Sequence, residues 1–454
     1  MTQDRARNLR VGSLARVEGE SALRLSLRGN RVTAAQLAIY EPPRFFEAFL
    51  RGRSHTEPPD LTSRICGICP IAYQLSASRA IEQACGIEVD GQIDALRRLM
   101  YYGEWIESHA LHIYMLHAPD FLGRDSGIEL ARTHRIEIER GLRLKHAGNT
   151  VIELLGGRAV HPVNIRVGGL HRAPDPRELR PLAEQLRRAG DDAAETIAWV
   201  AGFDFPDAWC GCALLALAEP GRYAIDSGTP TVMRAPDEGV PSERDLALPT
   251  RTFPLEEFTD HVVETQVPHS TALHSHLDGR VYLTGPLARY AISGSRLSPV
   301  ALQAARDAGL GDPREGTACR NPYRSIVVRA VEVFHAVDEA LRIIEAYEPP
   351  SRPHHDADPR PGSCHGATEA PRGLLYHRYT LDENGMVTQA TLIPPTSQNQ
   401  GMIEADLRSA VDERLDRGPA PDEELTALCE RVIRNHDPCI SCATHFLALS
   451  VDRT

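Results

Sequence analysis

Two periods in the hydrophobic pattern divide the chain into expected strands and helices. Apolar and polar residues alternate over residues 21–40, which predicts two strands around a turn at Arg28, Gly29 and Asn30. Elsewhere apolar residues recur at helical spacing, which predicts a series of helices. These helices are expected over residues 70–85, 93–117, 128–155, 178–200, 325–347 and 422–435.

The segments between the helices predict loops and short strands. Residues 202–323 are rich in Gly and Pro and mix short strands with loops, and residues 348–368 predict a polar surface loop. Residues 375–395 predict a hairpin around Asn384 and Gly385. Together these elements predict an α+β fold that is mostly helical, with small sheets at its periphery.

Composition narrows the class of protein. The chain has 454 residues, of which 42% are hydrophobic and 25% charged, the balance of a soluble globular protein. It has no apolar run of about 18 residues and no apolar signal core near its start, which predicts a cytoplasmic protein without a membrane span. The net charge of −12 and the lack of a basic patch argue against nucleic-acid binding.

Two pairs of cysteines have the spacing of metal ligands. Cys66 and Cys69 form one pair near the start of the chain, and Cys439 and Cys442 form the other near its end. Thiolate is a soft donor that suits zinc, nickel, copper(I) and iron–sulfur sites. The first pair precedes the expected helix over 70–85, whose backbone N–H groups would favour the thiolate form. A structural zinc site is one interpretation, although its two pairs usually lie about 15–20 residues apart.

Six short segments resemble motifs of the NiFe-hydrogenase large, catalytic subunit. RICGIC at 64–69 and DPCISCATH at 437–445 resemble that family's two signature motifs. The other four occur in the family's order: ARVEGE at 15–20, GGRAVHPVNIRVGG at 156–169, EAPRG at 369–373 and IPPTSQN at 393–399. In the family the last two are late loops that wall the active site. The resemblance implies one large domain over residues 1–445 with a deeply placed metal site.

The resemblance also implies a ligand set and roles for neighbouring residues. Nickel would be held by the four cysteines, and Cys69 and Cys442 would bridge to an iron that carries carbon monoxide and cyanide. Arg372 would lie over the iron and its cyanides, with Asp437 as its partner. A hydroxyl from either Thr396 or Ser397 would reach a cyanide nitrogen.

Three further positions match the family's proton path and its second ion. Glu18 matches the glutamate that passes protons to and from a cysteine ligand. Glu47 and His445 match ligands of a Mg²⁺ (or Fe²⁺) ion near the C-terminus. A maturation endopeptidase would cut directly after His445 once nickel-insertion factors have acted, and residues 446–454 would be removed.

The remaining chain implies partners for electron transfer. The other six cysteines spell no iron–sulfur motif, and no GxGxxG follows a strand, so electrons must leave through another subunit. The family pairs with an iron–sulfur small subunit. At Tyr73 the chain resembles the cytoplasmic, bidirectional members of the family. Those members add flavin-containing diaphorase subunits and use NAD(P).

Two other classes stay open at this point. One is a homologous 49-kDa-type quinone-reductase subunit of complex I, which lacks the four cysteine ligands that this chain has. The other is a non-catalytic, zinc-stabilised scaffold. Three residues of one expected helix have secondary interpretations: Ser108 stands where some relatives carry an aspartate near the arginine, and His109 and His112 are expected to serve packing rather than ligation.

Overall fold

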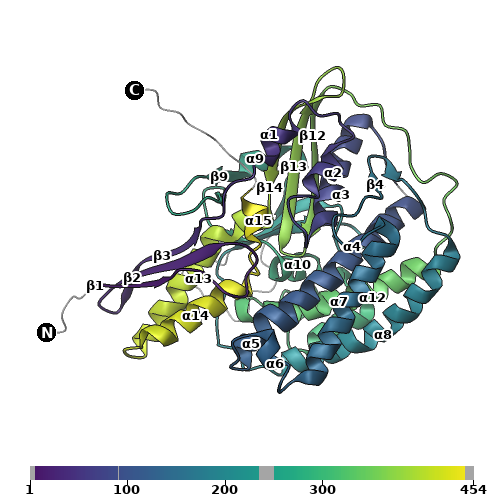
Figure 1. Cartoon of the computed structure of the whole chain (residues 1–454). Coiled ribbons are helices and arrows are strands. Elements are labelled where there is room, and N and C mark those ends of the chain that lie inside the picture. Colours follow the sequence, from purple (N-terminus) through teal and green to yellow (C-terminus); the bar gives the residue numbers. More distant parts are fainter. Residues whose placement is uncertain (1–5, 90, 235–249, 445–454) are drawn as a thin grey trace, which may run out of the picture.

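Four long helices pack together in the computed structural model, which describes residues 6–89, 91–234 and 250–444, and they lie at the lower right of Figure 1. They are α4 (Gly91–Leu111), α7 (Arg135–Gly156), α8 (Pro176–Ala201) and α12 (Ser325–Glu345). Helices α4 and α8 each pack against both α7 and α12. The approach of α7 to α4 requires a glycine, because a Cβ on Gly148 would lie 2.6 Å from the carbonyl oxygen of Gly103.

A three-stranded antiparallel sheet lies beside α3 (Pro70–Cys85). Its strands are β12 (Gly362–Ala370), β13 (Gly373–Leu381) and β14 (Val387–Ile393). Ala370 pairs with Gly373, so Arg372 lies in the tight turn between β12 and β13. Helix α3 and β12 are in direct contact, which brings the residues before α3 close to this turn.

A second antiparallel sheet covers the C-terminal helices. Strands β1 (Ala6–Val11), β2 (Ser21–Arg28) and β3 (Arg31–Ile39) lie along α13 (Pro395–Asp416) and α14 (Asp422–Asn435) (Figure 1). The shared core contains Leu23, Leu25 and Leu37 from the sheet and Ile403, Leu407 and Leu425 from the helices. The N-terminal and C-terminal segments of the described chain are therefore packed together.

The remaining elements are short. Strands β6 (Ala213–Ala218), β7 (Thr229–Met233), β8 (Thr250–Thr252) and β11 (Tyr282–Leu283) form a sheet in the order β11-β6-β7-β8. Two pairs of strands are β9 (Val262–Thr265) with β10 (His274–Leu277), and β4 (Ile165–Arg166) with β5 (Gly169–Leu170). The short helices are α1 (Phe46–Leu50), α2 (Pro58–Thr62), α5 (Ala118–Phe121), α6 (Gly127–Leu130), α9 (Phe258–His261), α10 (Pro286–Ser293), α11 (Pro299–Asp307) and α15 (Ile440–Ala443). None of the helices in the described ranges combines the length and apolar composition needed to cross a bilayer.

Most elements expected from the sequence are confirmed. The first hairpin, β2–β3, turns at the expected residues, and α3 and α14 have the expected bounds. Helices α8 and α12 and the β13–β14 hairpin also match. The mostly helical α+β class is confirmed.

Four expectations differ from the structure. The helix expected over 93–117 ends as a π-helix at His112–His117, and the one expected from 128 is interrupted, so that α7 begins at Arg135. The predicted loop over 348–368 contains the start of β12. The segment IPPTSQN was expected to be a loop but opens α13, whose buried first turns are polar on every side. Without an apolar stripe, periodicity gives no helical signal there.

Candidate metal centre

Four cysteine side chains from the two ends of the sequence meet in the interior. The Sγ atoms of Cys66 and Cys439 lie 3.4 Å apart, as do those of Cys69 and Cys442, and Cys439 and Cys442 are separated by 2.9 Å. All four sulfurs lie within 4.8 Å of one another, and each residue is at most 3% exposed. The arrangement offers four soft donors to one metal centre.

The first cysteine pair is held by the start of α3. Cys69 precedes Pro70, and the next backbone N–H groups, of Ile71 and Ala72, donate to the Glu104 carboxylate at 2.6 and 3.2 Å. These two amides therefore donate to Glu104 rather than to the sulfurs. The Ile68 N–H does point to Cys66 Sγ, at 3.3 Å. Burial raises the pKa of the Glu104 carboxyl.

The second pair is held by contacts with distant parts of the chain. Glu18 and Cys439 form an isolated parallel bridge, and the Ile440 N–H donates to the Glu18 carbonyl at 3.1 Å. The Ser441 N–H donates to Glu18 Oε2 at 3.0 Å, which places this half-buried carboxylate beside the first turn of α15, between the two cysteines in sequence. The Cys439 N–H donates to Thr396 Oγ1 at 3.0 Å.

Arg372 places a buried positive charge beside the sulfurs. Its Nε lies 3.1 Å from Asp437 Oδ2, and its Nη1 donates to Ser108 Oγ at 3.0 Å. Burial alone would lower the pKa of Arg372, but Asp437 and the cysteine thiolates raise it well above its usual range. Contact with the neighbouring thiols, Cys439 first, lowers the pKa of Cys66 well below its usual range. The neighbouring thiols and burial raise the pKa of Cys69, Cys439 and Cys442, so the Arg372 cation lies beside a cluster in which one of the four thiols ionises most readily.

The two candidate hydroxyls on α13 face different partners. Thr396 accepts the Cys439 N–H, whereas Ser397 Oγ donates to Glu264 Oε1 at 2.7 Å and to the Pro394 carbonyl at 3.0 Å. The structure therefore brings Thr396 to the cysteine cluster and Ser397 to strand β9.

Carboxylates gather near Glu47 on α1. Glu47 Oε1 accepts the Leu392 N–H at 2.7 Å. Glu264 on β9 lies close enough to interact electrostatically with the Glu47 carboxylate. Burial raises the pKa of Glu264 to about 7, and the Glu47 carboxylate adds to the shift. His445 lies outside the described residues. The residue before it in sequence is Thr444, whose carbonyl accepts the Arg44 N–H at 2.8 Å. Arg44 lies three positions before Glu47 in sequence.

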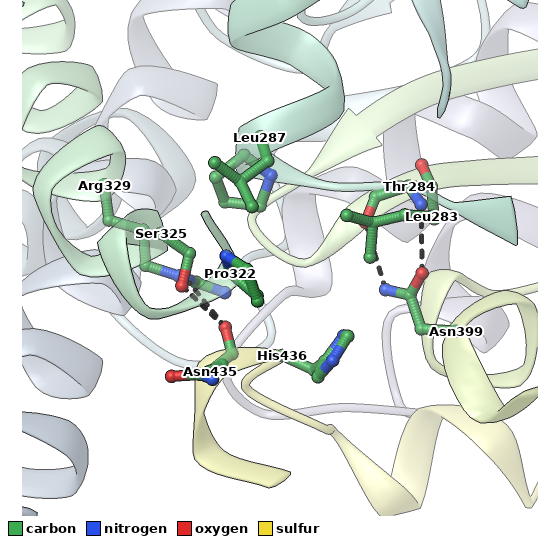
Figure 2. A pocket seen from close by; sticks show the side chains of 10 residues that line it. Leu283, Thr284, Leu287, Pro322, Ser325, Arg329, Asn399, Asn435 and His436 are labelled. Carbon is green, nitrogen blue, oxygen red and sulfur yellow. Dashed lines mark hydrogen bonds between the residues drawn. The ribbon is translucent and has the colours of Figure 1, made fainter. Parts of the chain in front are cut away.

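Other buried groups fix the segment that leads to Cys439. Figure 2 shows a small pocket lined by Ser325, Arg329 and Asn435. Its volume is about 20 Å³, which is room for one water molecule. Ser325 and Arg329 donate to the Asn435 carbonyl at 2.8 and 3.3 Å. His109 Nε2 lies 2.9 Å from Glu332, and His112 Nε2 lies 2.8 Å from the Arg434 carbonyl. Both histidines have packing and hydrogen-bonding partners and lie outside the four-cysteine cluster, as expected.

Three polar residues near the site were not predicted from the sequence. Glu104 caps α3, Glu264 lies beside Glu47, and Arg329 supports the segment before Cys439. Each is a single residue in a helix or a short strand, and no local pattern distinguishes it from an ordinary surface or core position.

The chain belongs to the nickel-dependent hydrogenase family, which it matches over residues 44–131 and 277–445. It is 31% identical over 445 residues to the alpha subunit of sulfhydrogenase 1 of Pyrococcus furiosus, covering 97% of this chain and 98% of the relative. It is 26% identical to the beta subunit of the NAD-reducing hydrogenase HoxS of Cupriavidus necator, over 97% and 95% of the two chains.

Solved structures agree with the family. A crystal structure of an NAD⁺-reducing [NiFe]-hydrogenase in the H₂-reduced state superposes with a TM-score of 0.84 at 26% identity, covering 97% of this chain and 99% of that chain. The Ni-Fe-Se hydrogenase of Desulfovibrio vulgaris Hildenborough shares the fold, with a TM-score of 0.78 at 21% identity over 97% and 100% of the chains. The protein is therefore the catalytic subunit of a nickel-dependent hydrogenase, and the buried cysteine cluster is its metal-binding site. The resemblance seen in the sequence is confirmed.

Proposed function

We propose that Cys66, Cys69, Cys439 and Cys442 hold a nickel–iron centre at which dihydrogen is cleaved reversibly and heterolytically. In this proposal Cys69 and Cys442 would also hold the iron, which would carry carbon monoxide and cyanide. The observation that carries the proposal is the meeting of four buried sulfurs within 4.8 Å. Their softness fits nickel, and the neighbouring guanidinium fits an anionic cluster.

Three residues around the centre have separate roles: Arg372 offsets its negative charge, Asp437 orients Arg372, and Thr396 holds the Cys439 segment. When bound, the nickel–iron centre supplies the Lewis acidity and the electron storage that the reaction needs. Asp437 and Ser108 take the hydrogen bonds of the Arg372 guanidinium, whose positive charge lies near the cysteines. Thr396 is the better placed of the two hydroxyls to meet a cyanide, because it contacts Cys439 while Ser397 contacts Glu264.

Glu18 moves the proton that heterolytic cleavage releases. Its carboxylate lies at the Ser441 N–H, between the two C-terminal cysteines in sequence, and it is half-buried. In this proposal one oxygen stays fixed by the backbone while the other exchanges a proton with a cysteine sulfur.

A Mg²⁺ (or Fe²⁺) ion near the C-terminus is the second part of the proposal, with Glu47 and His445 among its ligands. Two observations support it. The half-buried Glu47 and Glu264 lie close enough for their carboxylates to interact, and the Arg44–Thr444 hydrogen bond ties the sequence before Glu47 to the residue before His445. A cation would offset the repulsion between the two carboxylates.

Electrons leave through partner subunits in the proposed complex. We infer an iron–sulfur small subunit, and diaphorase subunits with flavin that pass the electrons to NAD(P). The support is the similarity to an NAD-reducing hydrogenase in sequence and to an NAD⁺-reducing [NiFe]-hydrogenase in structure. A cytoplasmic location and the single domain over residues 1–445 stay predictions of the sequence.

Isotope exchange tests the proposed function directly. The purified complex is incubated under D₂ in H₂O, and HD and H₂ formation are measured alongside NAD⁺ and NADP⁺ reduction under H₂. Exchange with nucleotide reduction is the expected result. A nickel-containing complex that exchanges no isotope under reducing, oxygen-free conditions would contradict the assigned reaction, whereas exchange without nucleotide reduction would contradict only the assigned acceptor.

A further inference from the structure

A second group of metal-ligating side chains lies away from the cysteine cluster. His269 follows strand β9, His274 begins β10, and Glu404 lies in the middle of α13. One ligand atom from each of the three lies within 4.8 Å of the other two. Glu404 is seven residues beyond Ser397 along α13, which is about 10 Å of helix. The group is thus separate from the residues assigned above.

We propose that His269, His274 and Glu404 bind one divalent ion of the zinc class. Two imidazole nitrogens and one carboxylate oxygen are the donors that zinc and similar borderline ions take in proteins, with water completing the coordination. The His269 Nε2 atom already lies 2.8 Å from Glu404 Oε1. The His269 and His274 rings lie edge to face, with centroids 5.5 Å apart.

The state of His274 points to a ligand rather than to packing alone. The residue is only 4% exposed, yet its Nε2 has no hydrogen-bond partner within the described part of the chain. An unpaired polar nitrogen in the interior destabilises the fold, and a metal ion would satisfy it.

Glu404 is prepared for the same ion. Its Oε1 accepts the Leu37 N–H of β3 at 3.1 Å, which orients the carboxylate from outside the group. The side chains of His269 and Glu404 remain 14% and 20% exposed, which leaves a route from solvent.

The ion would join β9, β10 and α13, and two of these elements carry residues near the catalytic centre. It would fasten the β9–β10 connection to α13, beside the edge of β3. The start of α13 provides Thr396, and β9 provides Glu264. Metal binding would therefore rigidify the framework behind the Cys439 segment, while the reaction itself needs no atom from this site.

Zinc analysis of the nickel-loaded complex tests the proposal. The wild-type complex and two variants, His274→Gln and Glu404→Gln, are treated with EDTA, equilibrated with Zn²⁺ and freed of unbound metal. Nickel, iron and zinc are then counted per complex. We expect the wild type to retain one Zn²⁺ more per catalytic subunit than either variant, at unchanged nickel content.

The matched control is His261→Gln. His261 also pairs with a carboxylate, Asp278 at 2.9 Å, but it belongs to no described three-ligand group. Its zinc content should equal that of the wild type. Equal zinc in the wild type, His274→Gln and Glu404→Gln would overturn the proposal and leave His269–Glu404 as an ion pair only. Should His274→Gln fail to assemble, the Glu404→Gln comparison decides alone. Neither result bears on the nickel assignment, because nickel is counted separately.

Discussion

Arg372 and Asp437 form a buried ion pair, with Nε and Oδ2 separated by 3.1 Å and both residues at most 3% exposed. The pair joins the turn between β12 and β13 to the residue two positions before Cys439. A second guanidinium hydrogen bond reaches Ser108 on α4, at 3.0 Å. The Arg372 side chain thus links the β12–β13 turn to helix α4 and to the segment that carries Cys439 and Cys442.

Replacing Arg372 by Lys should impair turnover while retaining the charge. A lysine carries its three donors on one nitrogen, so it cannot reach Asp437 and Ser108 from separate nitrogens as the guanidinium does. We expect the rate of dihydrogen oxidation to fall roughly 10- to 100-fold, the penalty of a small displacement at a reacting centre. The measurement is dye-linked dihydrogen oxidation, normalised to nickel content.

The control for this prediction is Ser108→Ala. It removes only one of the guanidinium contacts, and we expect a loss of about 1 kcal/mol in transition-state stabilisation, less than tenfold in rate. Equal rates per nickel for wild type and Arg372→Lys would show that the fork geometry is unimportant to the reaction.

Thr396 and Ser397 can be separated by substitution. Thr396→Val leaves the buried Cys439 N–H without its acceptor, which should destabilise the closed site by about 1–3 kcal/mol and lower nickel incorporation. Thr396→Ser keeps the hydroxyl and should restore nickel content. Ser397→Ala breaks a contact with Glu264 instead, so its nickel content should stay close to that of the wild type. The reverse ranking of the two sites would reject the assignment of Thr396.

Glu18→Gln tests the proton path. The glutamine oxygen can still accept the Ser441 N–H, so the metal centre should assemble. Without a titratable group, isotope exchange should fall by roughly 100-fold or more. The control is Glu41→Gln, which alters a carboxylate that accepts the Ser441 hydroxyl at 3.0 Å. Full exchange in the Glu18→Gln complex would remove Glu18 from the path.

Proteolytic maturation is a prediction about residues outside the described range. We expect the mature chain to end at His445, so that the segment bearing Cys439 and Cys442 closes only after metal delivery. The closed segment is held by Glu18, Thr396 and the Arg44–Thr444 hydrogen bond, contacts that an open segment would lack. An intact mass of the nickel-loaded subunit decides. An active, nickel-loaded chain that still ends at Thr454 would refute the prediction.

Amphipathic elements were predictable from the sequence, and polar ones were not. Helices α8 and α12 carry apolar stripes that the core requires, so their periodicity gave nearly correct bounds. Helix α13 begins with Thr396, Ser397 and neighbouring buried amides that bond to other elements, so the same method failed there.

The candidate site was predictable only in part. The cysteine pairs are separated by 373 positions, and spacing alone cannot bring such distant residues together. Their pairing came from the family resemblance and is now supported by the geometry. Glu104, Glu264 and His274 gained their surroundings only through tertiary packing, which local sequence does not encode.

The infrared spectrum of the purified complex tests the central claim most directly, because carbonyl and cyanide stretches have no counterpart in protein. We expect such bands in the nickel-loaded wild type and their loss, together with nickel and activity, in Cys442→Ser, because a serine oxygen is a hard and poorly ionised donor. The bands should change under H₂. A fully active wild-type complex without these bands, or a Cys442→Ser complex with normal turnover, would contradict the assignment of a nickel–iron centre to the four cysteines.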